Sequence, residues 1–169
     1  DTGQWGCSDR VPHDTAFRGH RGQHYLAAND LDGQTHAMTL KEAWDISGFD
    51  DRGVQFSAVA APGVFEEGDF LRLIADADGD DQFEILIAEF LPDRSGNLVG
   101  EGRALNSVFL DDDGKTRFYT FEDFFVELEP FLPADFNGTI RFRVEVNTDA
   151  DDEEIGFDNL RVTGTRSND

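Results

Sequence analysis

The sequence predicts an all-β protein that folds as a single antiparallel β-sandwich of the jelly-roll type. Three observations lead to this prediction. Short segments in which apolar and polar residues alternate recur along the chain, and this alternation is the period of a half-buried strand. Turns rich in Asp and Gly separate these segments, and no long amphipathic helical pattern competes with them. Roughly nine to eleven short strands at regular spacing are typical of a sandwich.

The length of 169 residues suits one domain with a sizeable core. We expect an irregular N-terminal arm over residues 1–23, a sandwich domain over residues 24–164 and a C-terminal tail over residues 165–169. The arm carries several glycines and shows little hydrophobic periodicity. The chain begins abruptly at Asp1, which is typical of a mature, processed product, so we expect a secreted protein.

The expected strands follow the arm in order. They are residues 24–28, 36–40, 54–60, 70–75, 82–90, 105–110, 116–121, 124–128, 140–146 and 155–163. The segment 140–146 has the clearest two-faced pattern, with apolar residues at every second position. Residues 41–48 fit either one helical turn or a continued edge strand, and residues 93–102 fit a polar loop. Because 16 residues are Phe, we expect a core built on Phe side chains.

The formal charge of −22 excludes some partners and favours others. Nucleic acid is not expected, because phosphates are bound by basic patches. The charge favours divalent cations and a saline medium, although an acidic solvated surface explains it equally well. Membrane insertion is not expected, since no apolar run approaches the roughly 20 residues of a membrane helix. Cys7 is the only cysteine, which rules out an intramolecular disulfide.

Four stretches of the sequence support a resemblance to known modules. They are FRG at 17–19 with HYLAANDLDG at 24–33, WDISG at 44–48, EGDFLRL at 67–73, and GFDNLRVTG at 156–164. In this order they resemble segments of extracellular jelly-roll modules of secreted bacterial-type proteins, namely MAM-like, laminin-G-like and carbohydrate-binding modules. The resemblance implies a calcium ion that fastens the first strand to the last. It places one ligand at Asp158 and the others among Asn29, Asp30 and Asp32.

The position of Asp158 within the last strand is consistent with a metal site. A buried carboxylate without a partner costs several kcal/mol, so Asp158 needs one. Calcium takes six to eight oxygen ligands at about 2.3–2.6 Å, and paired terminal strands with their turns can supply carboxylates and carbonyls. The metal ligands that the resemblance implies are Asn29, Asp30, Asp32 and Asp158. The alternative is that Asp158 caps a turn or accepts backbone N–H bonds without a metal.

A second acidic group, Asp76, Asp78 and Asp80, has the D-x-D-x-D spacing of a calcium loop. An EF-hand needs Gly at the sixth position and Glu at the twelfth, but the sequence has Asp81 and Ile87 there. We therefore expect a hairpin turn that is either solvated or holds a surface calcium ion. The acidic run 149–154 fits a solvated loop, and the alternative is that one of its members joins the calcium site.

Other candidate motifs are weaker. His20 and His24 are four residues apart, with His13 and His36 nearby, but a loop and strand do not bring them together as a helix would for zinc. The residues 111–113 are all Asp and precede Gly114, which is typical of a hairpin turn. No nucleophile with a matching base appears, and no G-x-S-x-G motif is present. The sequence therefore predicts that the chain is not an enzyme.

Two functions are consistent with these observations. The first is a secreted, non-catalytic, calcium-binding module that binds carbohydrate or another extracellular ligand. The second is a structural subunit of an extracellular filament, surface layer or matrix, assembled through the N-terminal arm and calcium. The expected partners are accordingly an extracellular glycan or neighbouring copies of the chain, and the expected location is extracellular or at the cell surface.

Overall fold

The computed structural model describes residues 4–8, 17–18, 21–106, 108–110 and 117–166. Within these ranges the chain is nearly all β, and its single helical element is a short 3₁₀ helix, η1, at Glu129–Phe131. The strands are β1 (Gln4–Ser8), β2 (Phe17–Arg18), β3 (Tyr25–Asn29), β4 (His36–Thr39), β5 (Trp44–Asp45), β6 (Phe49–Ala60), β7 (Phe70–Asp76), β8 (Ile85–Pro92), β9 (Leu98–Gly100), β10 (Arg103–Ala104), β11 (Val108–Leu110), β12 (Arg117–Thr120), β13 (Glu122–Glu127), β14 (Thr139–Asn147) and β15 (Ile155–Arg166).

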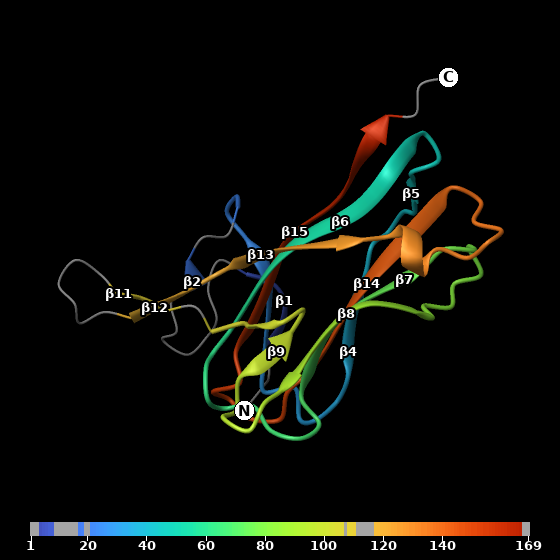
Figure 1. Cartoon of the computed structure of the whole chain (residues 1–169). Helices are drawn as coiled ribbons and strands as arrows, with labels where there is room; N and C mark the ends of the chain where they lie inside the picture. Colours follow the sequence, from blue (N-terminus) through green and yellow to red (C-terminus); the bar gives the residue numbers. More distant parts are fainter. Residues whose placement is uncertain (1–3, 9–16, 19–20, 107, 111–116, 167–169) are drawn as a thin grey trace.

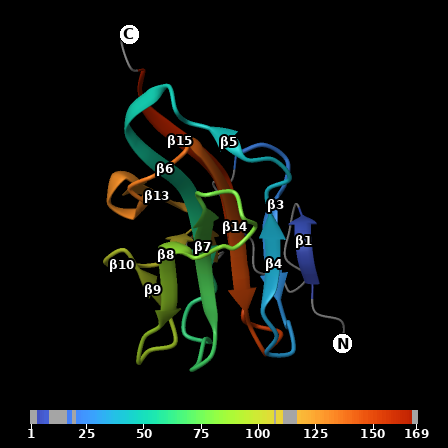
Figure 2. The ribbon, with the colours of Figure 1, turned by 90° about the vertical axis from the view of Figure 1, so that its right-hand side faces the viewer.

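The strands form two large antiparallel sheets that face each other (Figures 1 and 2). One sheet has the order β1-β3-β15-β6-β13, and the other has the order β10-β9-β8-β7-β14-β4, with β5 paired to β14. The strands β3-β15-β6-β13 opposite β4-β14-β7-β8 have the order of a jelly roll, so the predicted all-β sandwich is confirmed. A small third sheet, β11-β12-β2, includes the parallel pair of β12 and β2.

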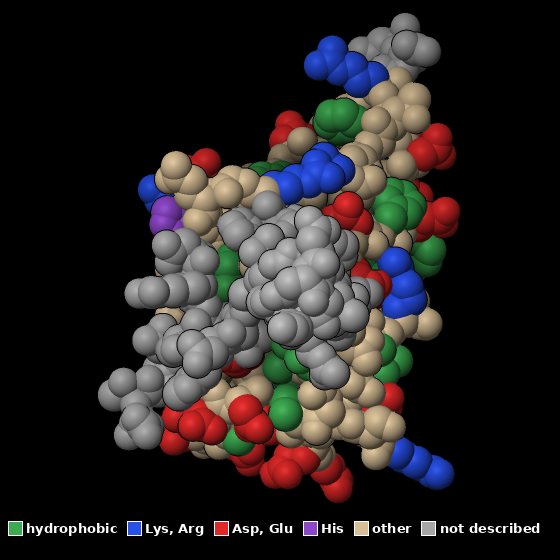
Figure 3. Space-filling model, turned by 90° about the vertical axis from the view of Figure 1, so that its left-hand side faces the viewer, with side chains coloured by type: hydrophobic (Ala, Val, Ile, Leu, Met, Phe, Trp, Pro, Cys, Tyr) green, Lys and Arg blue, Asp and Glu red, His purple; other side chains and the backbone are tan. Residues whose placement is uncertain are grey.

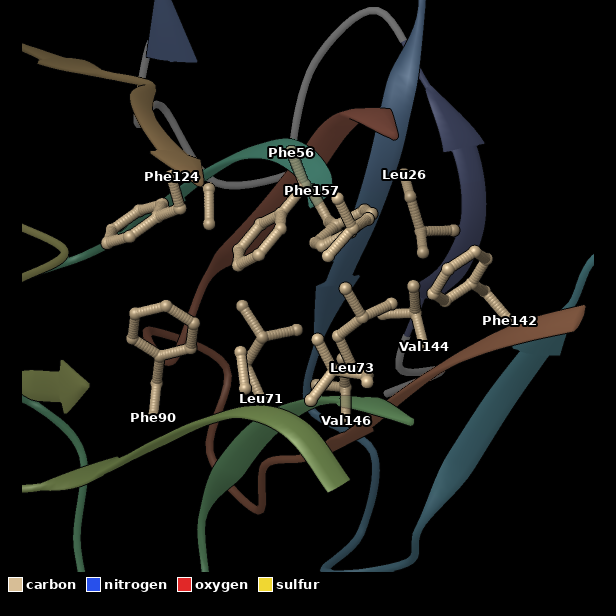
Figure 4. Packing of buried hydrophobic residues seen from close by; sticks show 14 of the residues in the cluster. Leu26, Phe56, Leu71, Leu73, Phe90, Phe124, Phe142, Val144, Val146 and Phe157 are labelled. Carbon is tan, nitrogen blue, oxygen red and sulfur yellow. The ribbon is translucent and has the colours of Figure 1, made fainter. Parts of the chain in front are cut away.

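The core lies between the two large sheets and is built on phenylalanine, as expected. Phe56 of β6 is stacked between Phe124 of β13 and Phe157 of β15, with ring centroids 5.3 and 5.4 Å apart. Figure 4 shows these rings facing Phe90 and Leu71 of the opposite sheet. The alternation expected in β14 is observed, because every second residue from Ile140 to Val146 is buried. Alternating apolar residues on both inner faces thus account for the two-layer architecture.

Several elements differ from the sequence expectation. The segment 41–48 contains the two-residue strand β5 at a sheet edge, and it has no helical turn. The expected polar loop 93–102 contains β9, which pairs with β8. The expected irregular arm 1–23 contributes β1, which pairs with β3 at the edge of a large sheet. These short or edge strands bury few residues, so their hydrophobic pattern is too weak to identify them. The division into arm, domain and tail stays a prediction.

Some predicted features lie outside the described residues. These are His13, His20 and the turn residues Asp111, Asp112 and Asp113. Cys7 of β1 is exposed and free. Among the residues that the structure describes, no helix is long and apolar enough to cross a membrane.

Candidate functional site

Three loops meet at one end of the sandwich and position a group of carboxylates. They are the β3–β4 loop (30–35), the β6–β7 loop (61–69) and the β14–β15 loop (148–154). The carbonyl oxygen of Thr148 accepts hydrogen bonds from the backbone N–H groups of Leu31 and Gly33, at 3.1 and 3.0 Å. The Ala61 N–H donates to the carbonyl oxygen of Glu154 at 2.9 Å. The β14–β15 loop is therefore fastened to both neighbouring loops.

Glu153 is the buried centre of this end of the molecule, with 1% of its surface exposed. Its Oε2 atom accepts hydrogen bonds from the backbone N–H groups of Asp149 and Ala150, at 2.6 and 2.8 Å. The side chain thus closes its own loop, because it caps the N–H groups three and four residues earlier. The expectation of a solvated loop holds for Asp151 and Asp152, which are exposed, but not for Glu153.

Asp69, directly before β7, supplies a second buried carboxylate, with 3% of its surface exposed. Its Oδ2 accepts the backbone N–H of Glu66 at 2.7 Å, and its own N–H donates to the Glu66 carbonyl at 3.1 Å. These two bonds fix a tight turn before β7. Asn147, the last residue of β14, pairs with Phe70 in the sheet register, and this pairing brings the β14–β15 loop beside Asp69.

Asp69, Asp149 and Glu153 converge. Each offers a carboxylate oxygen, and these oxygens lie within 4.8 Å of one another. Asp149 is exposed, so the group is open to solvent on one side. Among the described residues, no Lys, Arg or His forms an ion pair with Asp69 or Glu153. Figure 3 shows acidic side chains gathered at this end of the sandwich, which is the lower end in that view. The arrangement can hold a metal ion.

The electrostatics of the group are unfavourable for the charged forms. Burial raises the pKa of Glu153 to about 7, and the negative charge of the neighbouring Asp69 adds to this effect, although the two N–H bonds oppose it. Burial likewise raises the pKa of Asp69, against the hydrogen bond from Glu66. Two carboxylates in contact are stable when they share a proton or when a cation lies between them.

A second carboxylate group lies at the other end of β7. The structure brings Asp76, Asp78 and Asp80 together, with oxygens within 4.8 Å of one another, and a calcium ion held by them stays a prediction. Asp76 is buried and accepts backbone N–H bonds from Asp78, Gly79 and Asp81 at 3.3, 2.7 and 3.1 Å. Arg141 also pairs with Asp76 at 3.6 Å and with Asp81. The loop's own N–H groups and one guanidinium therefore already satisfy Asp76.

The first predicted site, formed by Asn29, Asp30, Asp32 and Asp158, is not brought together in the way that Asp76, Asp78 and Asp80 are. Asp30 and Asp32 have positive φ angles of 47° and 53° in the β3–β4 loop, and the Asn29 side chain donates to the Asp151 carbonyl at 3.4 Å. Asp158 lies further along β15, where it accepts the Arg21 N–H at 2.6 Å.

The sheet register explains this separation. Ala28, which precedes Asn29, pairs with Ile155, and Leu26 pairs with Phe157. Roughly four strand positions, or about 13 Å, therefore separate Asn29 from Asp158. The N–H bond to Asp158 matches the metal-free alternative stated above. A calcium role for Asp158 stays a prediction.

Sequence reasoning missed Asp69 and named Glu153 only within its acidic run. The sequence signal for Asp69 was its position directly before β7, because β7 pairs with β14 and β14 leads into the acidic run 149–154. An antiparallel pairing of 70–76 with 139–147 joins the two segments, but alternation alone does not indicate which strands pair.

Comparison with known proteins gives no family for this chain. No family model matches it, and no curated protein matches it. Two similar solved structures come from Fischerella sp. TAU, each 13% identical to this chain. One is the Stig cyclase Fisc in complex with (3Z)-3-(1-methyl-2-pyrrolidinylidene)-3H-indole, with a TM-score of 0.46 over 99% of this chain and 77% of that one. The other is a cyclase in complex with 4-(1H-indol-3-yl)butan-2-one, with a TM-score of 0.48 over 99% and 78%.

These matches contradict the functional predictions made from the sequence. Both matched structures are cyclases in complex with indole compounds. The predictions of a non-catalytic module that binds carbohydrate, of a filament or matrix subunit and of a chain without enzymatic activity are therefore withdrawn. The physical reason is that the motifs behind them lie in strands and turns, which indicate a fold, and a fold hosts many functions. At these TM-scores the likeness carries no cyclase activity over to this chain. The resemblance to MAM-like, laminin-G-like and carbohydrate-binding modules stays a prediction.

Proposed function

We propose that this chain is a calcium-binding β-sandwich domain of an extracellular protein. The ion joins the β6–β7 loop to the β14–β15 loop through Asp69, Asp149 and Glu153. One observation carries the proposal: two buried carboxylates, Asp69 and Glu153, lie within reach of a third and have no basic partner among the described residues. Such a group is stable only with a compensating positive charge or a shared proton.

The donor chemistry favours calcium. All three side chains offer hard carboxylate oxygens, and no His or Cys takes part. Asn147 adds a further oxygen donor close by, because its side-chain N–H₂ group donates to the Gly68 carbonyl at 3.1 Å, next to Asp69. The amide oxygen of Asn147 is buried and has no hydrogen-bond donor among the described residues. Calcium accepts such an irregular set with added water, whereas magnesium requires a near-ideal octahedron.

The bound ion would raise the free energy of unfolding. It binds the folded state alone, because the two loops that supply its ligands are brought together only by the pairing of β7 with β14. A site built from loops, with one exposed ligand, suits the dissociation constants of about 10⁻⁴ to 10⁻³ M that extracellular calcium modules have. The formal charge of −22 adds a general attraction for divalent cations. These features support an extracellular location.

Calcium titration of two matched variants tests the proposal. Asp149 and Asp151 are both exposed acids of the β14–β15 loop, but only the Asp149 carboxylate belongs to the converging group. We expect isothermal titration at neutral pH to show one calcium ion bound, a loss of affinity of about tenfold or more for Asp149→Asn, and a change below about twofold for Asp151→Asn. Equal effects of the two substitutions, or no calcium bound by the unaltered chain, would refute the proposal.

A further inference from the structure

A pocket of about 390 Å³ opens on the surface where β15, β6 and β13 lie side by side (Figure 1). The residues that line it include Gln55, Arg103, Asp123, Phe125, Asn159 and Arg161. A small apolar cluster around Tyr25 and Val59 covers one end of the outer face of this sheet, which is the face away from the core. Gln55 precedes Val59 in β6, so the pocket lies beyond this cluster.

Three side chains of the pocket form a row across the three strands. Gln55 of β6 pairs with Phe125 of β13 on one side and with Arg161 of β15 on the other. All three point to the outer face, because the residues before and after each of them pack in or against the core. Two contacts agree with this placement. The Arg161 Nε–H donates to Oε1 of Gln55 at 2.7 Å, and the Phe125 ring occupies the space that a Cβ atom on Gly53 would need.

This row presents hydrogen-bond donors. Because Oε1 of Gln55 accepts the Arg161 Nε–H, the group that Gln55 has left to offer is its N–H₂. Arg161 is exposed, and no acid among the described residues forms an ion pair with it, although the chain has 36 acidic residues. Its two terminal nitrogens are therefore available to a ligand.

The acids of this face lie in the next row and are already engaged. Asp123 and Asp158 both pair with Ser57 in the sheet register, one on each side. Oδ1 of Asp123 accepts the Ser57 hydroxyl at 2.5 Å, and Oδ2 lies 3.7 Å from the Arg21 guanidinium. Oδ2 of Asp158 accepts the Arg21 backbone N–H at 2.6 Å. Neither carboxylate belongs to the row of Arg161.

Arg103 of β10 is the second base of the pocket. Its guanidinium lies over the Phe124 ring, 4.5 Å from the centroid, and donates to the Asp123 carbonyl at 2.9 Å. It also pairs with Glu122 at 3.7 Å. Since Arg103 is held by these contacts, Arg161 is the base that has its charge free for a ligand.

We infer that this pocket binds a small aromatic carboxylate. The two terminal nitrogens of Arg161 donate parallel hydrogen bonds to the carboxylate, which matches the planar guanidinium in shape. The ring of the ligand packs on Phe125, which is 52% exposed. Two strand spacings of about 4.8 Å separate Phe125 from Arg161, so the row is about 10 Å long and suits a molecule of the size of benzoate. The inference is independent of the calcium proposal, because the pocket shares no residue with the Asp69 group.

Titrations with benzoate, benzamide and acetate, followed by NMR of the full ¹⁵N-labelled chain, test this inference. Benzamide keeps the ring and lacks the charge, whereas acetate keeps the charge and lacks the ring. We expect benzoate to cause saturable shifts of the Arg161 Nε–H, the Gln55 side-chain N–H₂ and the Phe125 amide, and to leave the indole N–H groups of Trp5 and Trp44 unmoved. Benzamide and acetate should each bind about fivefold more weakly, because one exposed ion pair and one ring contact each contribute modestly.

Three variants sharpen the experiment. Arg161→Gln should make benzoate bind no better than benzamide. Arg166→Gln is the matched control, since Arg166 is likewise an exposed arginine of β15 without an ion pair among the described residues, but does not line the pocket. Phe125→Ala should weaken benzoate and benzamide about fivefold and leave acetate unchanged. All three side chains are exposed, so the variants should keep the fold.

Four results would overturn the inference. They are the absence of saturable shifts at Arg161 and Phe125, benzamide or acetate binding as tightly as benzoate, an equal loss of benzoate affinity in Arg166→Gln and Arg161→Gln, and unchanged benzoate affinity in Phe125→Ala.

Discussion

Replacing Glu153 by Gln separates the charge of this buried side chain from its hydrogen bonds. In the native loop, Oε2 accepts two backbone N–H groups, and the other side of the carboxyl group faces Asp69. An amide oxygen can accept the same N–H groups, and the N–H₂ group can donate to the Asp69 carboxylate. Glu153→Gln therefore imitates the protonated form of Glu153 at every pH. We expect it to stabilise the metal-free protein at pH 8 and to abolish stabilisation by calcium.

The magnitude follows from the pKa of Glu153. That pKa is about 7 in the folded protein, against an ordinary value of 4.5. Each pKa unit corresponds to about 1.4 kcal/mol, so charging Glu153 at pH 8 costs the fold about 3 kcal/mol at most. We expect Glu153→Gln to recover between about 1 and 3 kcal/mol of unfolding free energy in EDTA. For a chain of this size that is a rise in Tm of about 2–10 °C.

Thermal and urea unfolding at pH 8, in EDTA and in millimolar calcium, measure both effects. The unaltered chain should gain about 2 kcal/mol when calcium exceeds its dissociation constant fiftyfold, and Glu153→Gln should gain almost nothing. Asp151→Asn serves as the control for the loss of one acid from the same loop. If Glu153→Gln lowers the stability in EDTA by more than about 1 kcal/mol, Glu153 has a structural role as an anion, and the account of a strained carboxylate pair is wrong.

Three further predictions follow from the described contacts. In EDTA the stability difference between the unaltered chain and Glu153→Gln should be small below pH 4.5 and should grow as the pH rises through about 7. The reason is that a carboxyl group with a raised pKa stabilises the fold only while its proton is bound. A constant difference in urea melts at several pH values would contradict this prediction. Phe56→Ala should lower the unfolding free energy by about 3–5 kcal/mol in urea melts, since Phe56 is 1% exposed and stacks on two other rings. Phe125 is 52% exposed, so Phe125→Ala should cost about 1 kcal/mol or less. Similar losses for the two variants would refute this account of the core. Gly100→Ala should lower Tm by several degrees, because a Cβ atom there would overlap the Glu89 carbonyl oxygen of β8. At Gly48 a Cβ atom would meet nothing, so Gly48→Ala should change Tm little. An unchanged Tm for Gly100→Ala would show that β9 can move away from β8 without loss of stability.

The sequence predicted the parts of this molecule that depend on local pattern. The alternation from Ile140 to Val146 places every second side chain in the core, and the structure has this strand with both faces as expected. The group of Asp76, Asp78 and Asp80 was also predictable, because one turn holds all three residues and Asp76 caps its N–H groups. Local chemistry was sufficient in both cases.

The other carboxylate group depends on contacts between distant segments. Asp69 meets Glu153 only because β7 pairs with β14 in a register that places Phe70 opposite Asn147. Alternation reveals which residues face the core, but it does not reveal which strands pair. The run from Asp149 to Glu154 also reads as solvated, since acids are rarely fully buried. Its last two members are buried because the loop folds back over Ala61.

A crystal structure of the chain grown in calcium tests the central claim most directly. The account predicts one ion with oxygen atoms of Asp69, Asp149 and Glu153 at about 2.3–2.6 Å, and the remaining positions filled by water or by the amide oxygen of Asn147. An ion bound only at Asp76, Asp78 and Asp80, or a bare pair of Asp69 and Glu153 carboxyl groups in saturating calcium, would contradict it.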